Sequence, residues 1–310
     1  MELRPLGFGE IFDRAITLYV RNFWPFLAIV LVLILPLAVL QYVLDSSQSS
    51  QLSEALRVLT HPSATPPTFT SMFSPGEIGT LVAMVILYFA LWPFVFVAAA
   101  VGVARVYRGR PVEFAACYRS VLPRWGAILV TQLIVIAVFI LWYGALLATL
   151  MLTVVVATLL AQAAVVLGII AFVFALVLLL AFLLLLALLW VALAFAMNAV
   201  VIEEVGPVAA IASGFGRVFS GKELPRALTF ALAAFAVILG AQLVGSAVAL
   251  AALFVHSVLL EVAVSALLRA ALAPFSIVLA AVYYFDVRIR REGYDLETEL
   301  ERIAAAPAVA

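Results

Sequence analysis

The stretch that decides the fold runs from Trp125 to Ile202 and reads WGAILVTQLIVIAVFILWYGALLATLMLTVVVATLLAQAAVVLGIIAFVFALVLLLAFLLLLALLWVALAFAMNAVVI. It contains no Asp, Glu, Lys or Arg over 78 residues. In hydrocarbon every backbone N–H and C=O must be hydrogen-bonded within the protein, so only helices and closed barrels cross a bilayer. Barrel strands alternate apolar and polar residues, whereas this stretch is continuously apolar. It therefore predicts transmembrane α-helices.

The whole chain has the same apolar character. Hydrophobic residues make up 67% of its 310 residues and charged residues 11%, against about half and about a quarter in soluble proteins. We therefore expect an all-α, polytopic transmembrane bundle. The formal net charge of zero argues against binding of nucleic acid, which needs a basic surface. Cys117 is the single cysteine, so no internal disulfide is expected.

The N-terminal segment predicts a retained span and not a cleaved signal peptide. No small-residue cleavage motif follows a short apolar run. Instead, a long apolar stretch follows a segment that carries Arg4, Glu10, Asp13, Arg14 and Arg21.

A helix needs about 20 apolar residues to cross a hydrocarbon core of roughly 30 Å. By this measure the sequence predicts six spans in a single membrane domain, 1–310, with a cytoplasmic tail at 288–310. The turn inside the long uncharged run is expected near 162–168. The expected spans are about 22–44, 80–104, 126–158, 169–202, 228–254 and 266–285.

The basic residues decide how often the long run crosses the membrane, because Lys and Arg collect in short cytoplasmic loops. With two crossings and a cytoplasmic N-terminus, 15 of the 17 basic residues lie inside and only Arg57 and Arg269 lie outside. With three crossings the split is 9 against 8. We therefore expect six spans and both termini in the cytoplasm. Tyr283 and Tyr284 are expected in the aromatic belt at the end of the last span.

Three similar units follow one another along the chain, at about 7–104, 112–202 and 207–287. Each is expected to pair a short amphipathic helix with a transmembrane hairpin, and chance similarity among Ala/Leu-rich helices is the alternative. The stretches 7–21 and 207–220 gather apolar residues on one helical face, which is typical of helices in the membrane interface. Arg217 lies opposite the apolar face of its stretch, so it is expected in water.

The two ends of the chain resemble a known family. The opening LRPLGFGEIFDR at 3–14 and the closing YYFDVRIRREG at 283–293 are similar to the two ends of bacterial glycerophosphoryl diester phosphodiesterase membrane-domain proteins. The stretches 201–204 and 213–221 match the middle of that family more loosely. The resemblance implies a six-helix domain in the plasma (inner) membrane with no assigned reaction. Because only about twenty residues follow the last span, the phosphodiesterase domain that names the family is not expected here.

The sequence predicts no catalytic residue, no metal and no cofactor. Proton relays and intramembrane proteases place ionisable groups at the centres of spans, and the first five spans have none there. His61 and His256 are too few for a metal site. Gln132, Gln242 and Asn198 are polar residues inside spans, where they predict hydrogen bonds between helices.

A few charged residues are candidates for contact with lipid or with a partner protein. Glu261 and Arg269 share one face of the last span with Ser257 and Ser265, because the four residues are spaced by four. They are interpreted either as a gate for a substrate or lipid headgroup, or as an outer-boundary ion pair that packs the helix, and the second is favoured. Glu203 is expected on a solvated face. The full candidate set is Arg14, Arg21, Arg217, Glu261 and Arg269.

Two functions are compatible with these patterns. The first is a non-enzymatic accessory or scaffold subunit of a membrane complex. It is favoured by the absence of candidate catalytic or metal-binding residues, by the short loops and by the amphipathic helices. The alternative is a transporter or lipid-handling protein, favoured by the repeat, by the mid-span Pro36, Pro93 and Pro274, and by Glu261 with Arg269. Expected partners are membrane lipids and other membrane proteins or a second copy.

Overall fold

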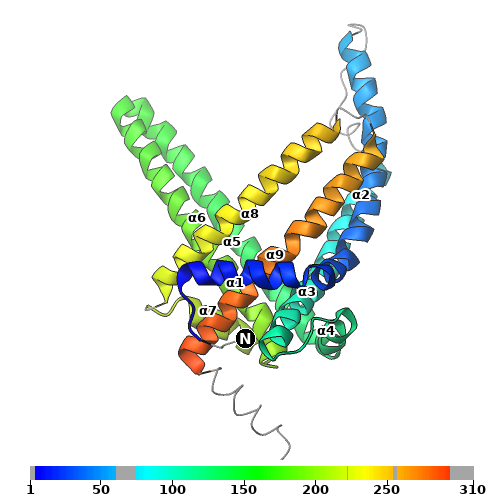
Figure 1. The fold of residues 1–310 in the computed structure, drawn as a ribbon. Coiled ribbons are helices and arrows are strands. Elements are labelled where there is room, and N and C mark those ends of the chain that lie inside the picture. The colour runs from blue at the N-terminus through cyan, green and yellow to red at the C-terminus, as the bar shows by residue number, and fades with distance from the viewer. Residues whose placement is uncertain (1–3, 61–73, 222, 254–256, 294–310) are drawn as a thin grey trace, which may run out of the picture. The chain divides into compact units, whose positions relative to one another are not determined.

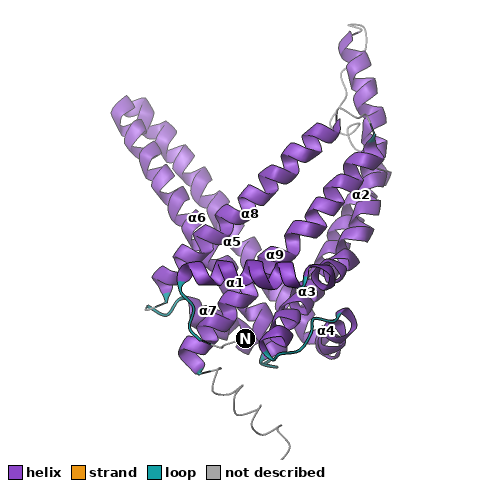
Figure 2. Cartoon of the chain, in the orientation of Figure 1, coloured by secondary structure: helices purple, strands orange, loops and turns teal. Residues whose placement is uncertain are grey.

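The computed structural model of the chain describes residues 4–60, 74–221, 223–253 and 257–293. Every regular element within these ranges is a helix (Figure 2). The predicted outer-side His61 and His256, and the tail beyond Gly293, lie outside the described residues. In chain order the helices are α1 (Phe8–Arg21), α2 (Phe23–Thr60), α3 (Pro75–Tyr107), α4 (Phe114–Val121), the 3-10 turn Leu122–Arg124, α5 (Trp125–Ala163), α6 (Val165–Ile202), α7 (Pro207–Val218), α8 (Leu224–Leu253) and α9 (Val258–Glu292) (Figure 1).

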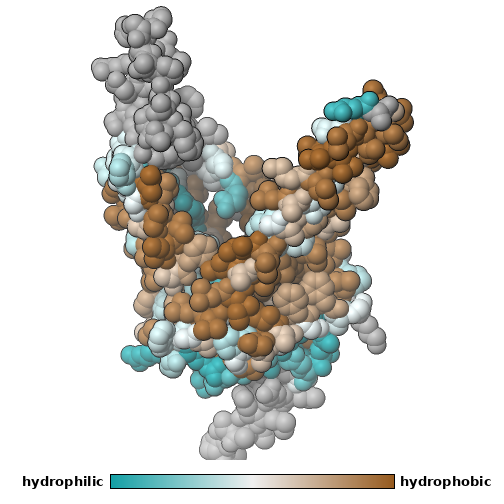
Figure 3. Space-filling view, turned by 180° about the vertical axis from the view of Figure 1, so that it is seen from behind, coloured by the Kyte–Doolittle hydropathy of each residue, from teal (hydrophilic) through white to brown (hydrophobic). Residues whose placement is uncertain are grey.

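Six helical segments in the described ranges are long and apolar enough to cross a membrane. This confirms the all-α architecture with six candidate spans, and the visible surface of the helices is mostly hydrophobic (Figure 3). The orientation of the termini and the threefold repeat stay predictions. The segments are Phe23–Ser47, Pro75–Tyr107, Phe114–Gln162, Val165–Ile202, Leu224–Ala247 and Val258–Glu292.

The long uncharged run forms an antiparallel hairpin of α5 and α6. The chain turns at Ala164, whose extended backbone (φ −161°, ψ 133°) separates the two helices, within the predicted 162–168. The glycine at 168 permits the tight turn, because a Cβ there would lie 2.6 Å from the Cβ of Ala161. At the other end, Arg124 donates a hydrogen bond to the carbonyl of Val200 (2.7 Å). The two ends of the run therefore lie close together, as expected of a hairpin, and the number of membrane crossings stays a prediction.

Local sequence signals explain where the helices begin and end. At the start of α3, the Ser74 hydroxyl accepts from the Glu77 N–H (3.2 Å), and the Glu77 carboxylate accepts from the Ser74 N–H (2.7 Å). This reciprocal cap satisfies two backbone donors that the first turn of a helix leaves free. Just beyond the end of α3, Gly109 adopts φ +71°, which a glycine tolerates without the strain a Cβ would cause.

The chain divides into two compact units. Unit 1 comprises the described residues within 9–122 and 238–282. Unit 2 comprises the described residues within 4–8, 123–237 and 283–293. In unit 1 the apolar face of α1 is buried, with Ile11, Ala15 and Leu18 at most 1% exposed. The Tyr19 hydroxyl at the end of that face donates to the carbonyl of Ala271 in α9.

Unit 2 has its core at the C-terminal half of α6. The Phe195 ring lies 5.4 Å from the rings of both Tyr283 and Tyr284, and the Phe230 ring stacks on Tyr283 at 3.9 Å. Tyr283 and Tyr284 are 1% and 0% exposed. The prediction that these two tyrosines form a lipid-facing belt was therefore wrong: their rings fill a protein core.

Within unit 2, the end of the α5–α6 hairpin near its turn at Ala164 is covered only where its own two helices pack on each other. In α6 the buried residues begin at Ala187, and the preceding turns expose apolar side chains. Leu141 and Met151 in α5 are 73% and 70% exposed, and Val165 in α6 is 72% exposed. This hairpin is thus an apolar surface that the rest of unit 2 leaves open.

Candidate functional site

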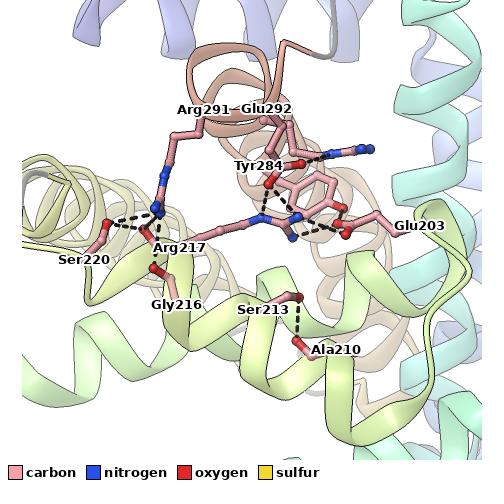
Figure 4. Close-up of polar contacts among 10 residues, drawn as sticks. Glu203, Ala210, Ser213, Gly216, Arg217, Ser220, Tyr284, Arg291 and Glu292 are labelled. Atoms are coloured by element: carbon pink, nitrogen blue, oxygen red, sulfur yellow. Dashed lines mark hydrogen bonds and ion pairs between the residues drawn. The ribbon is translucent and has the colours of Figure 1, made fainter. Parts of the chain in front are cut away.

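The richest group of charged contacts in the described residues lies in unit 2, where α7 meets the ends of α6 and α9 (Figure 4). We call it the Arg217 network, and it consists of Glu203, Arg217, Tyr284, Arg288 and Glu292. Glu203 directly follows α6, Arg217 lies in the last turn of α7, and the other three side chains project from the end of α9.

Arg217 is the centre of this network. Its Nη1 and Nη2 donate to the two carboxylate oxygens of Glu203 at 2.7 and 2.9 Å, which is a bidentate pair. Its Nε donates to Glu292 at 2.8 Å. The guanidinium also lies 5.4 Å from the centre of the Tyr284 ring, within cation–π range. Arg217 is 8% exposed, so these contacts replace most of its water.

The carboxylate of Glu203 is held in its charged form. The Tyr284 hydroxyl donates to the same carboxylate oxygen that accepts from Arg217 Nη1. Burial alone would raise the pKa of Glu203, but the hydrogen bonds from Arg217 and Tyr284 outweigh burial and lower this pKa below its ordinary value. Burial would likewise lower the pKa of Arg217, and the hydrogen bond to Glu203 reverses this and raises it. Both groups therefore stay ionised at neutral pH.

Two further arginines cap helix ends near the network. Arg291 Nη1 donates to the carbonyls of Gly216 and Arg217 (3.2 and 3.4 Å) and to the Ser220 hydroxyl (3.1 Å). Arg124 donates to the carbonyl of Val200 in the last turn of α6. Carbonyls at a helix C-terminus have no intrahelical partner and carry partial negative charge, so a cation there is stabilising.

A second charged cluster in unit 2, the Asp286 cluster, holds the N-terminal segment. Asp286 is 0% exposed and accepts from the backbone N–H of Leu6 (2.7 Å), from Arg226 (2.7 Å) and from Arg290 (3.1 Å). Arg226 and Arg290 both also donate to the Leu6 carbonyl. Asp286 and the two arginines therefore hydrogen-bond both the backbone N–H and the backbone C=O of the buried Leu6.

The sequence interpretation of Arg217 and Glu203 as water-facing was wrong. The buried residues of α7 are Ala210, Gly214, Arg217 and Val218, so small and charged residues contribute most of its inward side. Of its apolar residues, Val208 and Phe219 are 76% and 37% exposed and Val218 is 1% exposed. In a membrane protein an apolar face is satisfied by lipid, whereas small and polar residues are preferred between helices. The amphipathic pattern was therefore correct, but Arg217 on its polar side packs against the protein and does not face water.

The predicted ion pair of Glu261 and Arg269 does not form between them in the described residues. Arg269, in unit 1, instead donates to the side chain of Gln41 in α2 (2.6 Å) and to the Ser265 carbonyl (3.3 Å). Asp45 lies one helical turn beyond Gln41 on α2 and within electrostatic range of Arg269. The partner is a residue 228 positions away in the chain, which the spacing within one helix could not indicate.

The remaining predicted polar residues lie as follows. Arg14 is half-buried on α1, and Arg21 is exposed at its end. Asn198 is 0% exposed, yet neither polar atom of its side chain has a partner among the described residues. The predicted bridge from Asn198 to another helix is therefore not formed there.

The Arg217 network has a structural role, because its ion pairs hold helix ends together. Two carboxylates and two guanidiniums neutralise one another, and their contacts join α6, α7 and α9. No group of three or more His, Cys, Asp and Glu side chains is placed to hold a metal ion in the part of the chain that the structure describes.

Six long apolar helices, with charged networks that clamp helix ends in unit 2, define a multi-pass α-helical membrane protein. The family model of a domain of unknown function, DUF8558, matches residues 1–290, and the chain belongs to this family. No curated protein and no solved structure matches the chain.

Proposed function

We propose that the protein is a non-enzymatic accessory or scaffold subunit of a membrane complex in the plasma membrane, with both termini in the cytoplasm. The α5–α6 hairpin is the observation that carries this proposal. The turns near Ala164 are apolar and, within unit 2, are covered only where α5 and α6 pack on each other, and they provide a surface that another membrane protein can cover. The charged clusters join helix ends through ion pairs, which fits a structural protein better than a protein with a catalytic centre.

The length of the hairpin supports a protein partner. Helix α5 has 39 residues, which correspond to about 58 Å at a rise of 1.5 Å per residue. Even at a tilt of about 40°, the upper end of the common range, it spans about 45 Å. The hydrocarbon core is only about 30 Å thick. The apolar tip therefore reaches headgroup depth or beyond, where the apolar surface of another protein covers it better than lipid.

The resemblance to the membrane domain of glycerophosphoryl diester phosphodiesterases stays a prediction of architecture in this proposal. We assign no phosphodiesterase activity to the chain, because the described charged groups of unit 2 are committed to ion pairs and helix caps. A scaffold needs rigid helix contacts, and these groups supply them.

The test is site-specific photo-crosslinking in the native membrane, followed by mass spectrometry. A photoreactive amino acid is placed at Leu141 or Met151, and the matched control is the same amino acid at Ile128, which is 0% exposed. We expect the two exposed sites to crosslink the same protein, or a second copy of the chain, while Ile128 gives only internal crosslinks. Adducts with lipid alone at both exposed sites would contradict the scaffold role.

A second candidate, a transporter or lipid-handling protein, is favoured by one observation. Arg269 is an exposed arginine within a span that bonds a polar residue on a different helix, and charged residues within spans are costly unless they serve a function. Purified protein in liposomes would be assayed for lipid scrambling with fluorescent phospholipids. If the wild type moves lipid between leaflets and the variant Arg269→Gln does not, this candidate becomes the preferred one.

A further inference from the structure

The number of residues along α2 and α9 places the contact of Gln41 with Arg269 near one boundary of the hydrocarbon core. Gln41 lies eighteen residues beyond Phe23, the first residue of α2, about 27 Å along the helix axis. Arg269 lies seventeen residues before Asp286 on α9, about 25 Å along the axis. Because the core is about 30 Å thick, both counts independently bring this contact to the level where hydrocarbon gives way to headgroups.

The guanidinium of Arg269 is only partly satisfied by the described residues. It uses one N–H on the Ser265 carbonyl and one on Gln41. An arginine has five N–H donors, so three have no acceptor among the described residues. Since Arg269 is exposed, these donors face the surroundings of the helix, and at this depth a lipid phosphate is an acceptor within reach.

A negative charge accompanies the positive one. Asp45, half-buried on α2, lies four residues after Gln41 and so on the same helix face, within electrostatic range of Arg269. The Gln41 side chain, which accepts from Arg269, thus neighbours both charged groups. An anionic headgroup would be attracted by Arg269 and repelled by Asp45. A headgroup with both a phosphate and a primary ammonium group complements both charges.

We propose that Arg269, Gln41 and Asp45 form a binding site for a zwitterionic aminophospholipid headgroup. The phosphodiester accepts hydrogen bonds from the free guanidinium N–H groups of Arg269. The primary ammonium donates to the carboxylate of Asp45, and Gln41 positions the guanidinium of Arg269. This site does not depend on the scaffold role, because it binds lipid in the isolated protein.

The test measures which lipids the purified full-length protein retains. Nanodiscs are formed from phosphatidylcholine doped with equal amounts of phosphatidylethanolamine and phosphatidylglycerol, and lipids retained after extraction are counted by native mass spectrometry. The wild type is expected to retain phosphatidylethanolamine preferentially. Arg269→Gln should lower this retention roughly ten-fold, as expected for the loss of a charge-assisted hydrogen bond. Arg108→Gln, at an exposed arginine just after α3, is the matched control and should change nothing.

The variant Asp45→Asn separates this site from a general anion site. It removes the ammonium acceptor and leaves Arg269 charged, so the preference should shift from phosphatidylethanolamine to phosphatidylglycerol. An unchanged preference in Asp45→Asn would overturn the proposal, as would displacement of the lipid by soluble inorganic phosphate. If Arg269→Gln does not fold, Arg269→Lys keeps the charge without the planar fork, and it should retain less lipid than the wild type. Equal retention would overturn the site.

Discussion

Arg217 shows how a single residue can hold three helices together. Its side chain has carboxylate partners on α9 and on the residue that follows α6, and an aromatic ring beneath it. Removing one partner from a buried ion pair is costly, because the other charge then stays in a low-dielectric environment. The network is therefore a place where a single uncharged substitution has a large effect.

The variant Glu203→Gln is expected to lower the free energy of unfolding by about 3 kcal/mol, the cost of leaving a buried partner charge unpaired. The matched control is Glu204→Gln. The Glu204 side chain is 76% exposed and its contact with Arg124 is 3.5 Å long, so its loss should cost less than about 1 kcal/mol. Unfolding in mixed micelles measures both variants. If both variants lower the free energy of unfolding equally, burial of the Arg217 network contributes nothing to stability.

The pH dependence of stability follows from the lowered pKa of Glu203. A depressed carboxyl pKa adds stability that is fully present above the unfolded value of about 4.3. This stability is lost as pH falls through the lower folded value. Unfolding measured between about pH 6 and pH 3 should therefore show a decline that is weaker in Glu203→Gln. The same slope in that variant and in the wild type would show that Glu203 is not responsible.

At the scale of elements, the close packing of α7 on α6 depends on one glycine. A Cβ at Gly214 would lie 2.3 Å from the carbonyl oxygen of Ala192, whereas a Cβ at Gly216 would meet nothing within 4 Å. Gly214→Ala is expected to destabilise the protein by about 1–3 kcal/mol, because the backbones must separate. Gly216→Ala should be neutral or slightly stabilising, since alanine is the better helix former. Thermal unfolding in detergent would show the difference, and equal melting temperatures would contradict the close contact.

The elements themselves were largely predictable from the sequence, but their contacts were not. Long apolar runs determined the six candidate spans, and the uncharged run forms the two expected helices α5 and α6, while their membrane crossings stay a prediction. Amphipathicity located α7 but not its orientation, because in a membrane the apolar side of a helix can face either lipid or protein. The contact of Gln41 with Arg269 joins residues far apart in the chain, and no local pattern carries such information.

At the scale of the whole molecule, the account depends on which side of the membrane each loop occupies. In unit 2, Arg124, Arg217 and Glu292 come from the segment before α5, from α7 and from the end of α9, and all three contribute to its charged contacts. We infer that these segments lie in the cytoplasm, because the positive-inside rule places them there. The turn at Ala164 would then lie outside.

Reporter fusions test this central claim most directly, since alkaline phosphatase is active only outside the cytoplasm and a fluorescent protein folds inside it. Fusions after Arg110, Lys222 and Gly293 are expected to report the cytoplasm. Fusions after Gln48 and near Ala164 and His256 are expected to report the outside. A Lys222 fusion that reports the outside, together with an Arg110 fusion that reports the cytoplasm, would contradict the two crossings of the long run and the topology built on them.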